Sequence, residues 1–511
     1  MTNTTDNNKR IAKNTMLLYF RMIFMMVVSL YTSRVILKTL GIDDYGIFNV
    51  VGGVVSLFSF INGAMAGGTQ RYLTFALGKK DLKRMRTVFC TCVNIHLLIS
   101  AAILLLAETI GLWFFYEKMS IPADRLDAAF WVYQFSILSA IVMVVSVPYN
   151  ATIIAHEKMS AFAYISVLEV VLKLLIVYLL TIGSFDKLKL YALLFFCVQL
   201  AIRYVYGRYC KKHFEETHFK LIWDGQLIRE MAGFAGWNLL GNCAYISFTQ
   251  GLNILLNMFF GPAVNAARGV AIQVQGAITS FSGNFQTALN PQITKAYAAG
   301  DFAYMHTLVC KSSKFTFFLL YFLSLPVLFE TDMLLSLWLK DVPEYTIPFL
   351  RIILAITMVD AMANPLMISA AATGKVKVYQ TVVSAILLAI LPISYGVLKA
   401  GANPTAVFVV HFVICNVAFV VRLFIIRSLI HLSVRMYFQL VIVPALLVAV
   451  AGCVFPYGLK LVVNEGILSS IGVMAACVLG NAMAIYGLGL DAEEKHFIQH
   501  KLAGLLRKWK R

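Results

Sequence analysis

The sequence predicts an all-α polytopic membrane protein with about fourteen transmembrane helices, arranged as two pseudo-symmetric six-helix bundles plus two extra C-terminal helices. Three observations predict this fold class: the composition, a series of long apolar runs, and an internal repeat. The 511 residues are 60% hydrophobic and 13% charged. Soluble domains carry about 25% charged residues, so the composition excludes a soluble globular protein.

Apolar runs long enough to cross a bilayer follow one another along almost the whole chain. The predicted spans are 16–37, 47–69, 88–113, 129–154, 160–182, 189–209, 232–259, 268–290, 313–337, 348–371, 378–399, 405–427, 437–458 and 467–489. Together they take up roughly 310 residues. The longest hydrophilic gap runs from Cys210 to Glu230, which leaves little room for an aqueous catalytic domain.

The two halves of the chain repeat one another. A shift of 220 residues superimposes six identical residues without gaps, and a shift of 217 superimposes two more. The matching pairs are Gly41 with Gly261, Gly63 with Gly283, Ala76 with Ala296, Asp81 with Asp301, Met85 with Met305, Thr87 with Thr307, Pro148 with Pro365 and Lys158 with Lys375. Because each copy holds an even number of spans, the copies share one topology. Two such bundles around a midplane cavity form the architecture of an alternating-access transporter.

The repeat divides the chain into four predicted segments. These are an N-terminal six-helix lobe over 1–230, a C-terminal six-helix lobe over 231–430, two additional helices over 431–490, and a cytoplasmic tail over 491–511. In the tail, apolar residues recur at helical spacing among lysines and arginines. This pattern predicts a basic amphipathic helix that lies on the inner leaflet.

Lysine and arginine are concentrated in the loops on one side of the predicted membrane. That side holds about 30 of them, against about 9 on the other side. It includes both ends of the chain, so both termini are predicted to be cytoplasmic. The net charge of +18 therefore reflects membrane topology and not a nucleic-acid groove. The apolar run after Asn14 has no small-residue cleavage site, which predicts a retained signal anchor.

The first hairpin and the loops after it resemble a known family. The residues that carry the resemblance are Arg34, Leu40-Gly41 and Tyr45-Gly46 in the hairpin, Gly78-Lys79-Lys80-Asp81 after the second span, and Pro148 with His156-Glu157-Lys158 between spans four and five. With these motifs the chain resembles a Wzx-type polysaccharide (O-antigen or lipid-linked oligosaccharide) flippase of the multidrug/oligosaccharidyl-lipid/polysaccharide exporter superfamily.

The resemblance implies a function in surface polysaccharide and lipopolysaccharide biosynthesis. Such a flippase moves an undecaprenyl-pyrophosphate-linked oligosaccharide from the cytoplasmic to the periplasmic leaflet of the bacterial inner membrane by alternating access. The implied partners are this substrate and the membrane lipids. A coupling proton or Na+, and contacts with other polysaccharide-assembly proteins, are left open.

Charges within the hydrocarbon region are costly and are therefore functional candidates. The candidate cavity cations are Arg21, Arg34, Lys173 and Arg268. Arg21 and Arg34 also lie within snorkelling reach of an interface, which is the alternative interpretation. Lys173 lies deeper, and Glu169 precedes it by one helical turn. Lys173 is thus either half of a structural pair or a charge that meets the pyrophosphate once Glu169 releases it.

Asp360 is the other deep charge in the predicted spans. It pairs with a cation across the lobes or binds a coupling proton or Na+. Glu169 is the second candidate for charge pairing or ion coupling.

Polar side chains follow one face of the predicted seventh span. They are Asn238, Asn242, Tyr245, Thr249, Asn253 and Asn257. The steps of three or four residues place them on one face of a helix, and such a stripe cannot face lipid. Interhelical hydrogen bonding is one interpretation. The interpretation we prefer is a wet cavity wall that offers amide and hydroxyl groups to sugars.

No enzyme signature is present: the sequence lacks GxSxG, Walker-type GxxxxGK[ST], HExxH and GxGxxG motifs, so we expect no enzymatic activity. The nine cysteines include no CxxC pair, so neither a metal site nor a cofactor is predicted. Two rival functions remain. A cation-coupled multidrug antiporter of the same superfamily should carry acidic residues at its site. A membrane glycan polymerase or ligase should carry a sizeable periplasmic loop, which this chain lacks.

Overall fold

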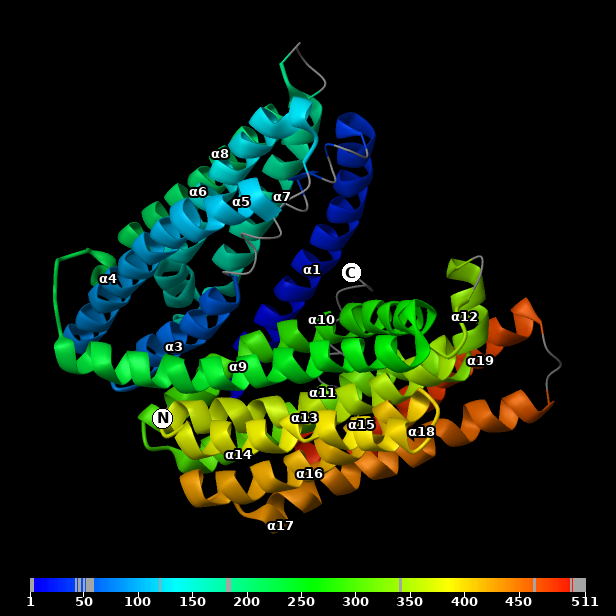
Figure 1. The fold of residues 1–511 in the computed structure, drawn as a ribbon. Coiled ribbons are helices and arrows are strands. Elements are labelled where there is room, and N and C mark those ends of the chain that lie inside the picture. The colour runs from blue at the N-terminus through cyan, green and yellow to red at the C-terminus, as the bar shows by residue number, and fades with distance from the viewer. Residues whose placement is uncertain are drawn as a thin grey trace, which may run out of the picture. The chain divides into compact units, whose positions relative to one another are not determined.

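The computed structural model describes residues 4–41, 44, 47–48, 51, 59–118, 121–180, 185–339, 342–462, 466–496 and 499. All regular structure within these residues is helical (Figure 1). In the described part of the chain, ten helical stretches, from 82–117 to 467–489, are long and apolar enough to cross a membrane. The predicted all-α polytopic fold is confirmed, and the chain is a multi-pass membrane protein.

The first half of the chain is helical over most of its described length. Its helices are α1 (Thr4–Leu40), α3 (Ser59–Gly78), α4 (Leu82–Leu106), η1 (Ala107–Gly111), α5 (Leu112–Lys118), η2 (Ala123–Arg125), α6 (Leu126–Ala155), α7 (Met159–Leu179), α8 (Lys187–His213), η3 (Glu215–Thr217) and α9 (Gly225–Phe260). Asp81 and Asp186 cap α4 and α8 with their carboxylates, because the first N–H groups of a helix have no backbone acceptor.

The second half of the chain is also helical. Its helices are α10 (Pro262–Ala298), α11 (Phe302–Phe329), α12 (Thr331–Trp338), α13 (Thr346–Thr373), α14 (Lys377–Leu388), α15 (Ile390–Lys399), α16 (Thr405–Ile430), α17 (Val434–Tyr437), η4 (Phe438–Ile442), α18 (Val443–Val462), α19 (Ile467–Ala484) and η5 (Ile485–Gly489). η1, η4 and η5 are single turns of π-helix.

Three predicted spans, 16–37, 232–259 and 268–290, lie in helices that are much longer than the spans. α1, α9 and α10 contain 37, 36 and 37 residues, so each is about 55 Å long at 1.5 Å per residue. α1 begins at Thr4 and so includes the polar segment before the predicted span. A helix satisfies its own backbone in water as well as in lipid, so it need not end at the membrane surface.

The chain divides into two compact units. Unit 1 comprises Met1–Asn242 with Thr287–Asp301, and unit 2 comprises Cys243–Gln286 with Phe302–Arg511. α9 and α10 each belong to both units, because the division falls inside them. The lobe boundaries at 230 and 430 stay predictions. The amphipathic tail helix lies mostly outside the described residues.

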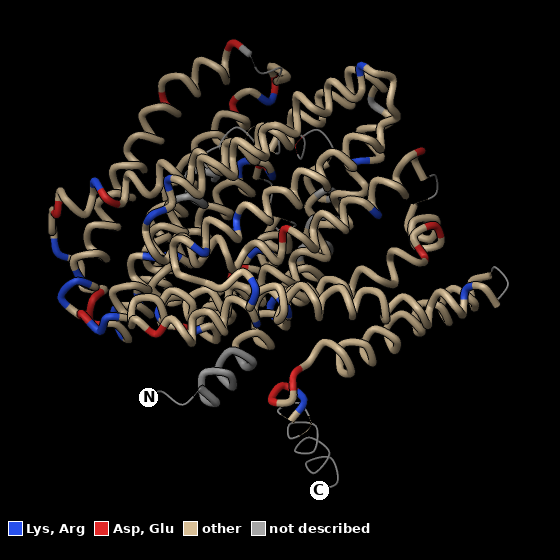
Figure 2. The backbone as a smooth tube through the Cα atoms, turned by 90° about the horizontal axis from the view of Figure 1, so that it is seen from below, with Lys and Arg blue, Asp and Glu red and all other residues tan. Residues whose placement is uncertain are grey.

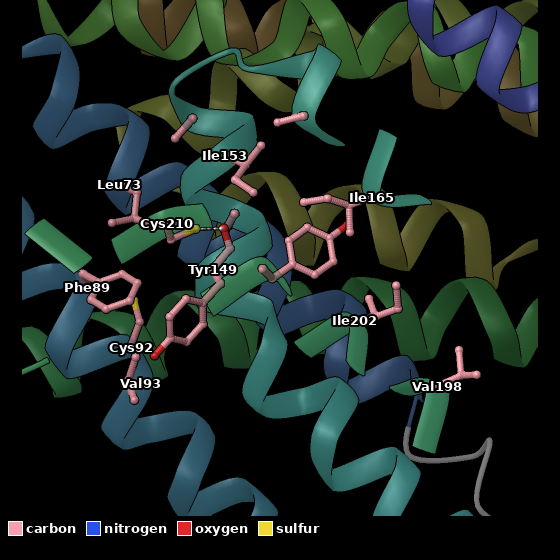
Figure 3. Packing of buried hydrophobic residues seen from close by; sticks show 14 of the residues in the cluster. Leu73, Phe89, Cys92, Val93, Tyr149, Ile153, Ile165, Val198, Ile202 and Cys210 are labelled. Carbon is pink, nitrogen blue, oxygen red and sulfur yellow. Dashed lines mark hydrogen bonds between the residues drawn. The ribbon is translucent and has the colours of Figure 1, made fainter. Parts of the chain in front are cut away.

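The core of unit 1 is an apolar cluster contributed by α4, α6, α7 and α8 (Figure 3). Tyr149 of α6 lies at its centre, with its ring edge-to-face against Phe89 at a centroid distance of 5.2 Å. Cys210 of α8 donates to the Tyr149 carbonyl at 3.4 Å. These helices therefore form one packed block that positions their polar residues.

Unit 2 is built around α11, α13 and α16, which pack side by side, and α18 and α19 pack together and against α11 (Figure 1). The charges are found mostly near helix ends, and the central parts of the helices are largely uncharged (Figure 2). This distribution follows from the cost of a charge in hydrocarbon. The exceptions in the helix interiors are the residues of functional interest.

Six of the nine left-handed residues in the described backbone form three pairs at repeated positions. Gly41 (φ 83°) corresponds to Gly261 (φ 79°) and Lys80 (φ 56°) to Gly300 (φ 75°) at the shift of 220, and Glu157 (φ 58°) corresponds to Gly374 (φ 78°) at the shift of 217. The helix-ending hydrogen bonds match as well: Asp81 N–H donates to the Ala76 carbonyl, and Asp301 N–H donates to the Ala296 carbonyl. The repeat read from the sequence is therefore also a repeat of turn geometry.

Candidate functional site

Two polar clusters interrupt the apolar helices, one in each unit. The first surrounds Arg21 on α1, where α1 packs on α7 and α7 packs on α8. The Arg21 guanidinium lies over the Phe162 ring at 4.3 Å, and its Nε donates to Met25 Sδ at 3.3 Å. Tyr206 and Glu169 act on it electrostatically. The structure thus brings Arg21 into the surroundings of the predicted Lys173–Glu169 pair.

Lys173 and Glu169 form the pair that their spacing predicts. Lys173 Nζ donates to Glu169 Oε1 at 2.7 Å, and the two side chains are 33% and 25% exposed. Lys173 Nζ also lies 5.2 Å from the centre of the Phe195 ring, and Gln199 Nε2 lies 3.5 Å from the same Glu169 oxygen. The charge of Lys173 is therefore neutralised, and its side chain remains partly exposed.

Arg203 on α8 is a further membrane-embedded cation, which the sequence analysis did not single out. Its guanidinium lies 3.8 Å from the centre of the Tyr149 ring, in a helix apolar enough to span a membrane. Among the described side chains, neither Arg203 nor Arg21 has a carboxylate in ion-pair contact. A count of every charge inside the predicted spans would have singled out Arg203. The side chain of the predicted Arg34 lies outside the described residues.

The second cluster includes the C-terminal part of the polar stripe on α9. Tyr245, Thr249, Asn253 and Asn257 belong to unit 2, whereas Asn238 and Asn242 belong to unit 1. Asn242, Tyr245 and Asn257 are exposed. Asn238 Nδ2 donates to the Phe234 carbonyl at 2.9 Å, and Thr249 donates to the Tyr245 carbonyl at 2.6 Å. Both bonds return to the stripe's own helix.

Arg268 on α10 binds the stripe directly. Its Nη1 donates to Asn253 Oδ1, and its Nη2 donates to the Thr249 carbonyl at 3.0 Å. The arginine is only 4% exposed. The turn at Gly261, whose φ is 79°, reverses the chain so that α9 and α10 lie antiparallel. The two predicted features, the stripe and Arg268, therefore form one site.

Asp360 on α13 faces the same region of unit 2. Its Oδ1 accepts from Cys415 Sγ at 3.0 Å and lies 3.6 Å from Arg422 Nη1. The Asp360 side chain is 41% exposed and Arg422 only 11%. Tyr245 lies within electrostatic range of Asp360 and Arg268. The cation that pairs with Asp360 thus comes from α16 of the same unit.

The arrangement offers charged and hydrogen-bonding groups within apolar helices but no catalytic constellation. In the part of the chain that the structure describes, no group of three His, Cys, Asp or Glu residues could hold a metal ion. Unit 1 presents guanidinium and ammonium groups on aromatic rings. Unit 2 presents amides, hydroxyls, the buried Arg268, the largely buried Arg422 and the partly exposed carboxylate of Asp360. Such sites suit a polar or charged molecule in transit across the membrane.

Solved structures with a similar fold span nearly the whole chain. An outward-facing multidrug resistance MATE family transporter of the MOP superfamily matches with a TM-score of 0.70 and 12% identity, over 83% of this chain and 96% of that one. A MATE in the bent conformation gives the same four values. The chain has the fold of the MATE transporters. A MOP superfamily transporter from Pyrococcus furiosus matches with a TM-score of 0.68 and 14% identity, over 83% and 96% of the two chains.

The sequence comparisons add no closer relative. No family model and no curated protein matches the chain. At 12–14% identity the structural likeness establishes the fold alone. The superfamily named in the sequence analysis therefore stays a prediction beyond the shared fold. The substrate has to be inferred from the chain's own residues.

Proposed function

We propose that this protein is an alternating-access flippase for an anionic lipid-linked glycan, an undecaprenyl-pyrophosphate-linked oligosaccharide. The observation that carries the proposal is the excess of cations in the unit 1 cluster. Lys173 pairs with Glu169, and among the described side chains neither Arg21 on Phe162 nor Arg203 on Tyr149 has a carboxylate in ion-pair contact. A cation in the membrane interior without a counter-ion is costly, and a diphosphate headgroup supplies the missing negative charge.

The packing of the two arginines supports an anion as the ligand. A guanidinium stacked on an aromatic ring keeps its planar N–H edge available, and this edge matches phosphate oxygens in pairs. Arg21 on Phe162 and Arg203 on Tyr149 both have this arrangement. Lys173 becomes a third contact when the headgroup competes with Glu169 for its ammonium group.

In this proposal the unit 2 cluster binds the sugars. Tyr245 and Asn257 are exposed along α9, and amide and hydroxyl groups are the partners that sugar hydroxyls require. The lipid tail needs no polar partner and stays in the bilayer. The concentration of lysine and arginine in one set of loops supports a location in the bacterial inner membrane with both termini in the cytoplasm.

A second candidate is a cation-coupled multidrug antiporter. The structural neighbours include a transporter named for multidrug resistance, and the 41% exposed carboxylate of Asp360 is the kind of group that a proton or Na+ would bind. These neighbours favour the antiporter over the flippase. The neighbour from Pyrococcus furiosus is described by a binding pocket of reverse polarity that suggests a different function. The cationic cluster of this chain leads us to rank the flippase first.

The test is headgroup translocation in reconstituted vesicles loaded with a fluorescent lipid-linked oligosaccharide. Replacing Arg21 and Lys173 together by glutamine should slow translocation at least about tenfold, since hydrogen bonds to charged groups contribute about 1.5–3 kcal/mol each. Arg84→Gln is the matched control, because Arg84 is a 45% exposed cation in the first turn of α4 and is paired with Asp224. An unchanged rate in the double variant would reject the charge role. Efflux of a cationic dye without glycan movement would establish the antiporter instead.

A further inference from the structure

The last turns of α10 contact a buried carboxylate within unit 1. Glu157, in the turn between α6 and α7, accepts from Lys295 Nζ at 2.5 Å and from Gln292 Nε2. Its own carbonyl accepts from Asn14 Nδ2 of α1 at 3.4 Å. The Glu157 side chain is 1% exposed and Lys295 22%. One residue therefore joins the ends of α1 and α10 to the α6–α7 turn.

Close apolar packing completes this contact. Leu18 of α1, Met159 of α7 and Ala288 of α10 are fully buried against one another. At the end of α3, a Cβ added to Gly78 would lie 2.7 Å from Ala298 Cβ and 3.0 Å from the Lys295 carbonyl oxygen. Only glycine at position 78 lets the end of α10 approach so closely. The sequence analysis noted Gly78 and Glu157 in two separate motifs, and the structure brings them to the same helix end.

The backbone at Glu157 shows that its side chain is retained against a cost. Glu157 has φ 58° and the equivalent residue of the second copy, Gly374, has φ 78°. This left-handed conformation is free of steric cost only for glycine. The second copy uses the residue that the turn prefers, whereas the first copy keeps a strained glutamate. Strain of this kind persists where a side chain has a function.

We propose that the end of α10 (residues 292–298) is a releasable latch that is closed by the Glu157 carboxylate. The proposal rests on the alternating-access part of the proposed function, because α10 belongs to both compact units and its far end must be free to move when access changes. By the orientation proposed above, the latch lies on the cytoplasmic side. Glu157 closes it through Lys295 and Gln292, and Gly78 provides the space into which the helix end docks.

The experiment measures docking of the helix end without any substrate. Ala296, which is 6% exposed, is replaced by cysteine as a reporter of similar size on the docked face of α10. In the full-length protein in inverted vesicles, the rate of labelling by a membrane-impermeant maleimide is compared with and without Glu157→Gln. Glu157→Gly is a second variant that removes the carboxylate and also relieves the strained backbone. Lys158→Gln is the matched control, because Lys158 is the exposed neighbour in the same turn.

Both Glu157 variants should raise the labelling rate of position 296 by about tenfold or more, as expected for loss of a charge-assisted contact. Lys158→Gln should leave the rate unchanged, and the native Cys92, which is fully buried in unit 1, should stay unlabelled throughout. Equal rates with and without Glu157 would overturn the latch, as would an increase in Lys158→Gln or parallel exposure of Cys92. Failure of the proposed substrate would appear only in the translocation assay, so the two failures are distinguishable.

Discussion

Replacement of Asp360 by asparagine should destabilise the protein more than replacement of its partner Arg422 by methionine. Arg422 is the buried member of the pair, with 11% of its side chain exposed against 41% for Asp360. Removing the carboxylate leaves a buried guanidinium without its counter-ion, which costs about 3–5 kcal/mol. Removing the arginine leaves a carboxylate that keeps its bond from Cys415 at 3.0 Å and is partly exposed, which costs about 1–2 kcal/mol.

The distance between the two groups supports this magnitude. At 3.6 Å between Arg422 Nη1 and Asp360 Oδ1, the gross attraction is about 4.6 kcal/mol at an effective dielectric constant of about 20. Desolvation offsets part of it, so the net loss in Asp360→Asn lies within the range above. The double variant should be less destabilised than Asp360→Asn alone, because methionine removes the buried charge that asparagine leaves unpaired.

The assay is thermal unfolding of the purified protein in detergent, with the three variants and the parent measured under one set of conditions. Asp360→Asn should show the lowest Tm of the three. A Tm for Asp360→Asn equal to or above that of Arg422→Met, or additive losses in the double variant, would refute the reasoning. Either result would mean that water or lipid headgroups, and not Asp360, compensate the Arg422 charge.

Two further predictions concern parts of the fold outside this pair. Gly111→Ala should lower the free energy of unfolding by about 1–3 kcal/mol, because the added methyl group would overlap the Tyr133 hydroxyl. That hydroxyl donates to the Ala107 carbonyl at 2.8 Å. Gly233→Ala is the control and should not lower Tm, because no atom lies within 4 Å of the added methyl group. At Asp186, burial alone would raise the pKa, but N–H groups of Lys189 and Leu188 and the charge of Arg125 outweigh it, so the pKa is lowered. The carboxylate therefore stabilises the fold above its ordinary pKa of 3.8 and loses this effect as pH falls through the lower folded-state value. Tm of the parent should fall in that acid range more steeply than Tm of Asp186→Asn, and equal slopes would exclude the role of Asp186.

The sequence predicted the helices because hydrocarbon imposes a simple rule on them. A run of apolar residues must be helical in a bilayer, so span positions follow from composition alone. The polar helices α9 and α10 were also predicted, since the asparagines of the stripe on α9 recur at helical spacing. The spacing of Glu169 and Lys173 was enough to predict their contact, because residues four apart on one helix meet whatever the tertiary fold.

The rest of the site depends on which helices become neighbours, and no local pattern contains that information. Asp360 and Arg422 are separated by 62 positions and meet only because α13 packs on α16. Arg203 lies inside the predicted span 189–209 but was not among the candidate cations, and its contact with Tyr149 places it beside the apolar core of unit 1. Contact partners between helices, unlike helices themselves, require the packed structure.

The matched left-handed turns have an evolutionary consequence. Two copies of one repeat can share their backbone architecture while their side chains have different functions. At the third pair of turns, Gly374 of one copy and Glu157 of the other have the same left-handed backbone but different side chains. Divergence of this kind after duplication makes the two halves of a symmetric fold functionally different. The positions at which the two copies disagree on glycine are therefore the first places to look for acquired roles.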